Sequence, residues 1–174
     1  MEIINLDKEK YQGYKFKAQY FTDKYYDVDV LENGFILKVK DFPQGEVTRG
    51  FEDELFSEWL EDPVAFGIIE NNLPVAFIEG SVEAWHKLFR ISNIYVSKEY
   101  RRKGIADKLM VKMIQYAKSL DGIRGIILET QTCNFGAIQL YKKHGFKLTR
   151  IDLNEYSNSD VENKAVRIDL LLKI

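Results

Sequence analysis

The stretch "NIYVSKEYRRKGIADKLM", from Asn93 to Met110, joins an apolar strand-like segment to a helix-like segment. Between them lies a basic loop, whose four cations precede the lone Gly104: Lys98, Arg101, Arg102 and Lys103. From Gly104 onward, apolar residues recur at helical spacing, at Ile105, Leu109, Met113, Ala117 and Leu120. A strand, a charged loop and an amphipathic helix are therefore expected here in succession.

The cations of this loop stand where helix electrostatics disfavour them. A helix N-terminus carries roughly half a positive charge, and each nearby exposed cation costs about 0.3–1 kcal/mol. No Ser, Thr, Asp or Asn stands immediately before Gly104 to cap the helix. A bound polyanion would remove the conflict, because it accepts hydrogen bonds from the free N–H groups and pairs with arginines. The residues alone leave two interpretations open, an anion site and a solvated loop.

The composition predicts one folded domain, residues 1–174, because 174 residues with 45% apolar content suffice for a single core. The net charge of -2 argues against a nucleic-acid partner, so an anion site must be local. One cysteine, Cys133, and two histidines exclude a disulfide framework and a cysteine-based zinc site, and we expect no metal. Without a signal-peptide pattern or a bilayer-length apolar run, we expect a soluble, cytoplasmic protein that does not contact a membrane.

The chain before Asn93 is expected to form strands and one helix. Residues 24–30 and 34–39 alternate like two strands joined by the turn "ENG". Residues 51–62 space Phe51, Leu55, Trp59 and Leu60 like one helix face, with Pro63 as the stop. A hairpin around the turn "NNL" (residues 71–73) and a strand over 88–96 follow.

The chain after the amphipathic helix alternates strands with a second helix. A buried-type strand begins at Gly125, Asn134 is positioned to cap a helix, and Gly145 is expected to end that helix. Strands over 146–153 and 165–172 flank a polar loop. The strands on either side of the first helix need a helical crossover and should be parallel. These patterns predict an α/β fold, a mixed central β-sheet with helices packed on both faces.

Two motifs resemble the GNAT superfamily of N-acetyltransferases. "RRKGIA" (residues 101–106) is similar to the Arg/Gln-x-x-Gly-x-Gly/Ala loop of that family, in its usual place between a strand and an amphipathic helix. "ETQTCNFGAIQLYKKHGF" (residues 129–146) resembles the family's strand–Asn–helix–Tyr–x–x–x–Gly–Phe segment. The amino-acid sequence of this segment, together with "IDL" at 151–153 and Trp85, most resembles that of streptothricin acetyltransferases. The resemblance spans about Trp85 to Leu153 and implies the GNAT fold.

The resemblance implies that acetyl-CoA is the acetyl donor. Backbone N–H groups of the loop would hold the pyrophosphate, and the preceding strand end would bind the pantetheine amides. A backbone N–H near Val96 would polarise the acetyl carbonyl and stabilise the oxyanion that forms. The implied cofactor-binding residues are Ile94, Tyr95, Val96, Arg101, Arg102, Lys103, Gly104, Ile105, Ala106, Asn134 and Tyr141.

Tyr141 is the residue that the resemblance implies as general acid, donating a proton to the departing thiolate. Spacing alone favours a simple contact of a buried helix face, and the motif favours the catalytic role. Asn134 could cap its helix, bind the pantetheine arm, or do both. Cys133 is interpreted as a small buried residue, because direct transfer needs no nucleophile, and His144 as part of the helix end.

The proton acceptor for the attacking amine is left open between Glu129, Glu79 and water. A strand carboxylate such as Glu129 is also commonly an ion-pair residue. A cationic substrate would suit a pocket of negative charge, and Trp85 is either a wall of that pocket or core. The expected substrate-binding residues are Glu79, Trp85, Glu129 and Asp152.

The function expected from these motifs is acetyl transfer to a primary amine of a small cationic molecule, with a streptothricin as first candidate. One alternative is an N-acetyltransferase acting on a protein N-terminus, a lysine or a polyamine. A second is a non-catalytic CoA-binding regulatory module, against which Tyr141 and the intact loop both argue. The resemblance is compatible with a homodimer.

Overall fold

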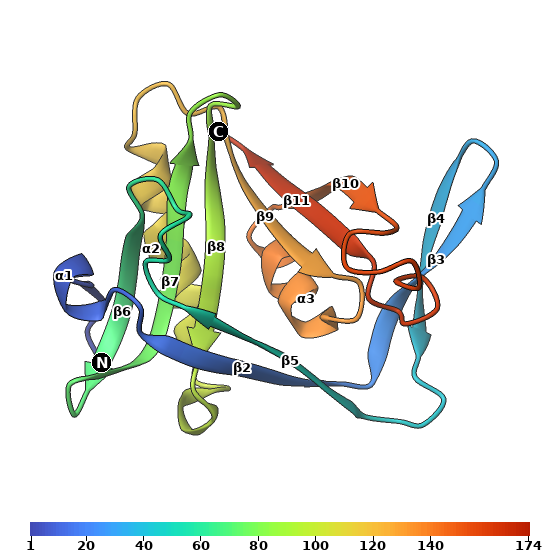
Figure 1. The fold of residues 1–174 in the computed structure, drawn as a ribbon, viewed down its shortest axis with the longest axis horizontal. Coiled ribbons are helices and arrows are strands. Elements are labelled where there is room, and N and C mark those ends of the chain that lie inside the picture. Colours follow the sequence, from blue (N-terminus) through green and yellow to red (C-terminus); the bar gives the residue numbers. More distant parts are fainter. The chain divides into compact units, whose positions relative to one another are not determined.

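The computed structural model describes all of residues 1–174, which form two compact units. The first comprises Met1–Ala18, Phe51–Leu128 and Leu172–Ile174, and the second comprises Gln19–Gly50 and Glu129–Leu171. The elements, shown in Figure 1, are β1 (Ile4–Asn5), α1 (Lys8–Tyr11), β2 (Lys15–Thr22), β3 (Lys24–Leu31), β4 (Gly34–Asp41), β5 (Val47–Glu54), β6 (Val64–Glu70), β7 (Leu73–Glu83), β8 (Leu88–Val96), η1 (Lys98–Tyr100), α2 (Ile105–Lys118), β9 (Gly125–Gln131), α3 (Phe135–Lys143), β10 (Lys147–Asp152) and β11 (Arg167–Lys173). Strands β2, β5, β9 and β11 each continue from one unit into the other.

The first unit is built on a sheet in which β1, β6, β7, β8 and β9 follow one another in that order. The first three pairings are antiparallel, whereas β8 and β9 are parallel, with Leu88–Ile91 alongside Gly125–Leu128. Helix α2 connects this parallel pair, which confirms the predicted crossover. The principal sheet has seven strands and is mixed, so the predicted α/β fold class is confirmed.

The two faces of this sheet are covered by different parts of the chain. Helix α2 lies along one face (Figure 1). There the rings of Phe66 and Phe89 contact Tyr116 of α2, with centroids 5.5 and 5.9 Å apart. The residues next to Phe66 and Phe89 in their strands point to the opposite face of the sheet. There, buried residues from α1, β2 and the segment after β5 form one apolar cluster with the sheet: Leu6, Tyr11, Phe16, Leu55, Phe56, Ala65 and Phe77.

The helix predicted over residues 51–62 is wrong. Strand β5 continues to Glu54, and turns follow it. Phe56 and Asp62 adopt positive φ of 55° and 43°, which a right-handed helix does not contain. Leu55 is held by tertiary partners instead: its N–H donates to the Tyr14 carbonyl, and its own carbonyl accepts from Gly13. The apolar spacing that suggested a helix thus belongs to a strand and a buried turn, while Trp59 is 67% exposed.

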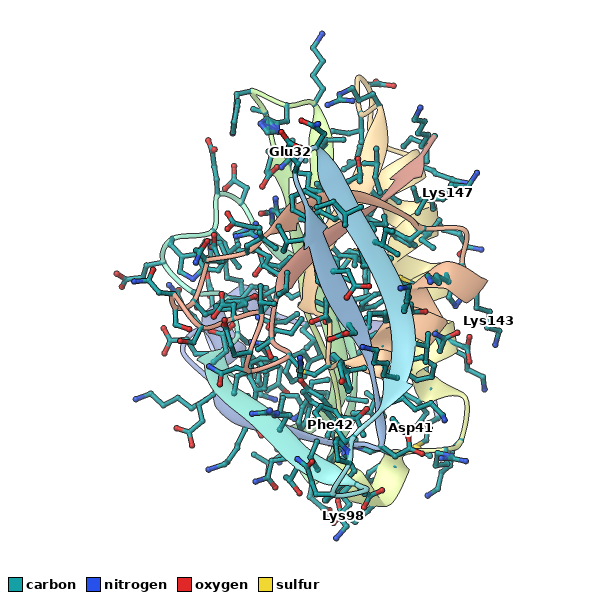
Figure 2. The ribbon with its side chains drawn as sticks, turned by 90° about the vertical axis from the view of Figure 1, so that its right-hand side faces the viewer. Glu32, Asp41, Phe42, Lys98, Lys143 and Lys147 are labelled. Atoms are coloured by element: carbon teal, nitrogen blue, oxygen red, sulfur yellow. The ribbon has the colours of Figure 1, made fainter.

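The second unit contains the β3–β4 hairpin, helix α3 and the antiparallel pair β10–β11. The predicted hairpin over residues 24–30 and 34–39 is confirmed, with Lys24 paired with Asp41 and Leu31 with Gly34. Figure 2 shows Glu32 at its free end. Tyr26 of β3 stacks on Phe135 of α3, with ring centroids 5.7 Å apart.

Helix α3 ends as the sequence predicted. Gly145 has a φ of 87°, its N–H donates to the Lys142 carbonyl at 3.0 Å, and the Phe146 N–H donates to the Tyr141 carbonyl at 3.1 Å. This pair of bonds is the Schellman arrangement that terminates helices. Asn134 occupies the N-cap position, as expected, although its side chain makes no capping hydrogen bond. No helix of the protein is long and apolar enough to cross a membrane.

Candidate active site

The basic loop is folded back onto the end of β8. The Nε of Arg101 donates to the Val96 carbonyl at 2.8 Å, and the Ser97 N–H donates to the Val75 carbonyl at 2.9 Å. Arg102 and Gly104 both have left-handed backbone conformations, with φ of 63° and 72°. Two left-handed residues so close together turn the chain sharply from the strand into α2.

The start of α2 leaves backbone donors available. Gly104 is its N-cap and supplies no side-chain cap, and the first backbone bond inside the helix joins the Lys108 N–H to the Gly104 carbonyl at 3.2 Å. The N–H groups of Ile105 and Ala106 precede that bond and have no acceptor within the helix. A side chain built at Gly104 would meet no atom within 4 Å, so the space beside it is open. With Arg102 and Lys103 exposed alongside, the loop has the donors, charge and room that a diphosphate needs.

The last residues of β8 pair with β7. Strand β8 ends at Val96, and Ile94, Tyr95 and Val96 lie opposite Ile78, Phe77 and Ala76. A bulge between Glu79 and Gly80 of β7 places Ser92 as the extra residue of β8. Bulges of this kind redirect nearby side chains and are common beside active sites.

A buried hydrogen-bond network lies beside this bulge. The Nδ2 of Asn93 donates to Glu79 Oε2 at 3.0 Å and to Asp53 Oδ2 at 3.1 Å. Glu79 Oε1 accepts from the Phe56 N–H at 2.5 Å, and Ser92 Oγ lies 3.4 Å from Oε2. Glu79 is fully buried, and this desolvation raises the pKa of its carboxyl group, an effect that its hydrogen bonds partly offset.

Sequence reasoning missed Asp53 and Asn93. Asp53 lies in the segment wrongly predicted to be helical, and Asn93 reads simply as the polar start of an apolar strand segment. The register alone pairs Asn93 with Glu79, and only the tertiary fold brings Asp53 to the same amide. A polar residue pair at facing positions of two otherwise apolar strands was the one available signal.

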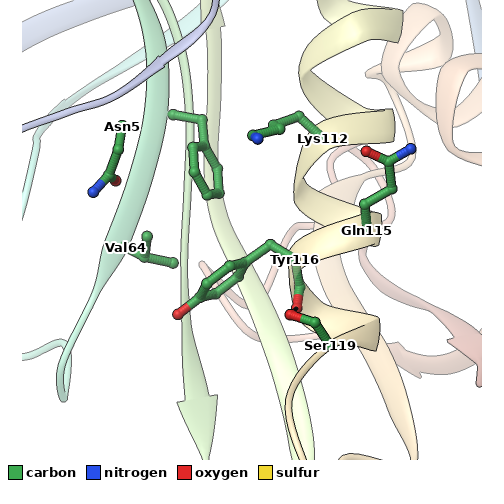
Figure 3. A pocket seen from close by; sticks show the side chains of 7 residues that line it. Asn5, Val64, Lys112, Gln115, Tyr116 and Ser119 are labelled. Atoms are coloured by element: carbon green, nitrogen blue, oxygen red, sulfur yellow. Dashed lines mark hydrogen bonds between the residues drawn. The ribbon is translucent and has the colours of Figure 1, made fainter.

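A groove with a volume of about 530 Å³ runs past Asp53. Its lining comes from β2, β5 and the following turn: Lys15, Phe16, Lys17, Glu52, Asp53, Glu54 and Ser57. A second pocket, of about 470 Å³, lies against β6 and the later turns of α2, where Figure 3 shows Lys112 and Tyr116. None of the predicted site residues lines either pocket.

Tyr141 is buried in the second unit, on the face of α3 that also carries Ile138. Its ring lies 6.3 Å from that of Phe146. Burial raises the pKa of the Tyr141 hydroxyl, and the group is protonated at neutral pH. A protonated hydroxyl is the form that a general acid requires.

The other predicted residues of the second unit are engaged to different degrees. Glu129 is exposed and forms an ion pair with Arg167, whose Nη2 lies 2.8 Å from Glu129 Oε2. This pairing agrees with the ion-pair interpretation. Asp152 is exposed and accepts the Asn154 N–H at 3.0 Å, which is a local turn contact. Asn134 has a side chain that caps nothing, whereas Cys133 is fully buried, as predicted.

Trp85, in the first unit, lies at the turn between β7 and β8 and is 84% exposed. Because most of its surface is exposed, Trp85 is not a core residue, and the predicted alternative of a core position is wrong. Its ring contacts that of His86. His144 is the C-cap of α3, as expected. No group of three or more His, Cys, Asp or Glu side chains is arranged to hold a metal ion.

The fold and the loop define the class of protein. A model of the acetyltransferase (GNAT) family matches residues 32–146, well over half of the chain, and the chain therefore belongs to this family. It is an N-acetyltransferase with the GNAT fold, as the resemblance implied.

Streptothricin acetyltransferases are among the most similar relatives. The Escherichia coli streptothricin acetyltransferase is 33% identical over 156 residues, which are 90% of this chain and 86% of that protein. Streptothricin acetyltransferase A of Bacillus subtilis is 30% identical over 66% of this chain and 71% of its own. A nourseothricin acetyltransferase structure superposes with a TM-score of 0.74 at 19% identity, covering 99% of this chain and 97% of its own. A Bacillus anthracis structure described as a putative streptothricin acetyltransferase in complex with acetyl coenzyme A has a TM-score of 0.72 at 22% identity, with 99% and 97% covered.

Proposed function

We propose that this chain transfers the acetyl group of acetyl-CoA to a primary amine of a small cationic molecule, with a streptothricin-type antibiotic as first candidate. The observation that carries the proposal is the loop from Arg101 to Ala106. The space beside Gly104 is open, and the first backbone N–H groups of α2 have no side-chain cap. The names of the relatives support the acceptor, and the 33% identity over most of both chains supports it most directly.

Acetyl-CoA fits the residues that are present. Its pyrophosphate would accept N–H groups between Arg102 and Ala106, and the guanidinium and ammonium groups there would pair with its charge. The pantetheine amides would bind the backbone of Ile94, Tyr95 and Val96, at the end of β8 that leads into the loop. Asn134, whose side chain caps nothing, would hydrogen-bond the same arm.

The chemistry is a direct transfer in which the amine nitrogen forms a bond to the acetyl carbon. The carbonyl becomes an oxyanion, stabilised by a backbone N–H near Val96. When the oxyanion collapses, the carbon–sulfur bond breaks and the thiolate takes a proton from Tyr141. The amine proton leaves to a base, and free CoA and the acetamide are the products.

The base remains a choice between Glu129, Glu79 and water. Glu129 is exposed but already paired with Arg167, and Glu79 has a raised pKa but is fully buried. A water molecule could connect either carboxylate to the amine. We also propose Asp152 and Trp85 as substrate contacts, because both side chains are exposed.

The test is an incubation of the protein with acetyl-CoA and a panel of amines, in which the released thiol is measured. The panel contains streptothricin, a polyamine, a free lysine derivative and an N-terminal peptide. Turnover restricted to streptothricin, together with raised resistance of cells expressing the chain, is the expected result. Preference for the peptide, lysine or polyamine would favour the first alternative. Tight CoA binding without turnover on any amine would favour the regulatory module.

Three broader expectations belong to the same proposal. Residues 1–174 act as one acetyltransferase domain, the protein is cytoplasmic, and a homodimer is compatible with its activity. Cell fractionation tests the location, and sedimentation of the purified protein tests the oligomeric state. Limited proteolysis, which cuts first between independent domains, tests the single domain.

A further inference from the structure

We propose that Asp53 binds a charged ammonium group of the acceptor, other than the amine that attacks, in the groove beside β5, and that Asn93 positions its carboxylate. This inference rests on the proposed function, because it names a residue that recognises the acceptor of that reaction. It concerns one carboxylate, one buried amide and one groove, all in the first unit.

The carboxylate of Asp53 is held at both oxygens. Oδ1 accepts the Glu54 N–H at 2.8 Å, and Oδ2 accepts Asn93 Nδ2 at 3.1 Å. The side-chain amide of Asn93 has two N–H donors, and here both go to carboxylates, since Nδ2 also donates to Glu79. Asn93 is only 4% exposed, so its amide is shielded from water and its orientation is set by these two partners.

Glu79 anchors this arrangement from the buried side. Both of its oxygens accept hydrogen bonds, and none of its surface is exposed. The donor to Oε1 is the N–H of Phe56, whose φ of 55° is uncommon for a bulky residue. Strained conformations persist where the surroundings fix them and are often found at functional sites. Glu79 and Asn93 thus fasten the segment from Asp53 to Phe56 to β7 and β8.

Asp53 differs from Glu79 in facing the groove. It is partly exposed and lines the cavity of about 530 Å³, whose other lining includes the ring of Phe16. Glu52 is paired with Lys17 at 3.0 Å across the same groove, so these two charges offset each other. Each oxygen of Asp53 accepts one bond from the protein and keeps capacity for another. A primary ammonium, which has three N–H donors and a positive charge, matches this fixed acceptor.

The location also suits the reaction. Asn93, which holds Asp53, immediately precedes Ile94, where the strand end proposed to bind the pantetheine arm begins. An ammonium group on Asp53 would therefore be bound beside that strand end. In this arrangement the carboxylate selects amines that carry positive charge, which neither the loop nor Tyr141 can do.

The experiment compares Asp53→Asn with the wild-type protein in the thiol-release assay, using streptothricin and, separately, an N-terminal peptide as acceptors. Loss of a charge-assisted hydrogen bond should raise KM for the cationic acceptor by about 10- to 100-fold. KM for acetyl-CoA should stay unchanged. Glu70→Gln is the matched control, because Glu70 is an exposed carboxylate of β6 in the same unit that does not line the groove, and its KM values should stay close to the wild type.

A second variant separates binding from folding. Asn93→Ala keeps Asp53 but removes the donor that orients it, so KM for the acceptor should rise while KM for acetyl-CoA is retained. Thermal melting of both variants shows that the compared proteins are folded. An Asp53→Asn protein with wild-type KM on every acceptor that the wild type uses would overturn the inference and leave the proposed function standing. A wild-type protein that turns over no amine would overturn both.

Discussion

Gly104 offers the sharpest test of the proposed CoA-binding loop, through the substitution Gly104→Glu. Its φ of 72° is left-handed, so a side chain there costs about 1–2 kcal/mol of stability. No atom lies within 4 Å of the added Cβ, so no steric clash adds to this cost. For a chain of this length, the melting temperature should fall by only about 2–8 °C. The protein should therefore fold.

The effect on CoA should be far larger than the effect on folding. A glutamate carboxylate about 4 Å from a phosphate oxygen is repelled by about 4 kcal/mol at an effective dielectric constant of about 20. That energy corresponds to roughly a thousandfold loss of affinity. Calorimetric titration with CoA measures it directly, and thermal melting measures the cost to folding.

Gly122 provides a matched control at the other end of the same helix. It has a φ of 76°, a Cβ added to it would meet no atom within 4 Å, and it follows α2 rather than preceding it. The 14 residues of α2 separate the two glycines by about 20 Å. Gly122→Glu should lose similar stability but bind CoA normally. If Gly104→Glu also bound CoA normally, the loop would not be the pyrophosphate site.

Three further predictions concern the chemistry. Tyr141→Phe should lower kcat by about 100-fold or more while CoA affinity changes little, as steady-state kinetics and calorimetry can show; an unchanged kcat would remove Tyr141 from its role. Glu129→Gln should flatten the acidic limb of the pH–rate profile if Glu129 is the base, and an unaltered profile would transfer that role to Glu79 or water. Because the pKa of Glu79 is raised by folding, the folded protein binds this proton more tightly than the unfolded chain does, and wild-type stability should fall as pH rises above about 4.5 toward the raised value. Denaturant unfolding of the wild type and Glu79→Gln across that window tests the sign, since the variant should lack this component of the pH dependence.

Local patterns predicted those parts of the fold that depend on neighbouring residues. The β3–β4 hairpin, the crossover helix α2 and the stop of α3 at Gly145 all follow from turn residues and spacing within one segment. The helix predicted over 51–62 failed because Leu55 and Phe56 pack against β2 and the sheet, at a distance in sequence. A spacing of three or four residues cannot distinguish a helix face from a strand followed by a buried turn.

The same distinction applies to the site. The sequence alone pointed to the family, and it predicted an anion site at the loop around Gly104, because "RRKGIA" is contiguous and its charges are unfavourable at a helix start. Only the tertiary structure decided that Glu79 is fully buried, that Glu129 is paired with Arg167, and that Asp53 reaches the amide of Asn93. The physical reason is that burial and pairing depend on chain segments distant in sequence, whereas a loop at a helix start contains its own donors and charges.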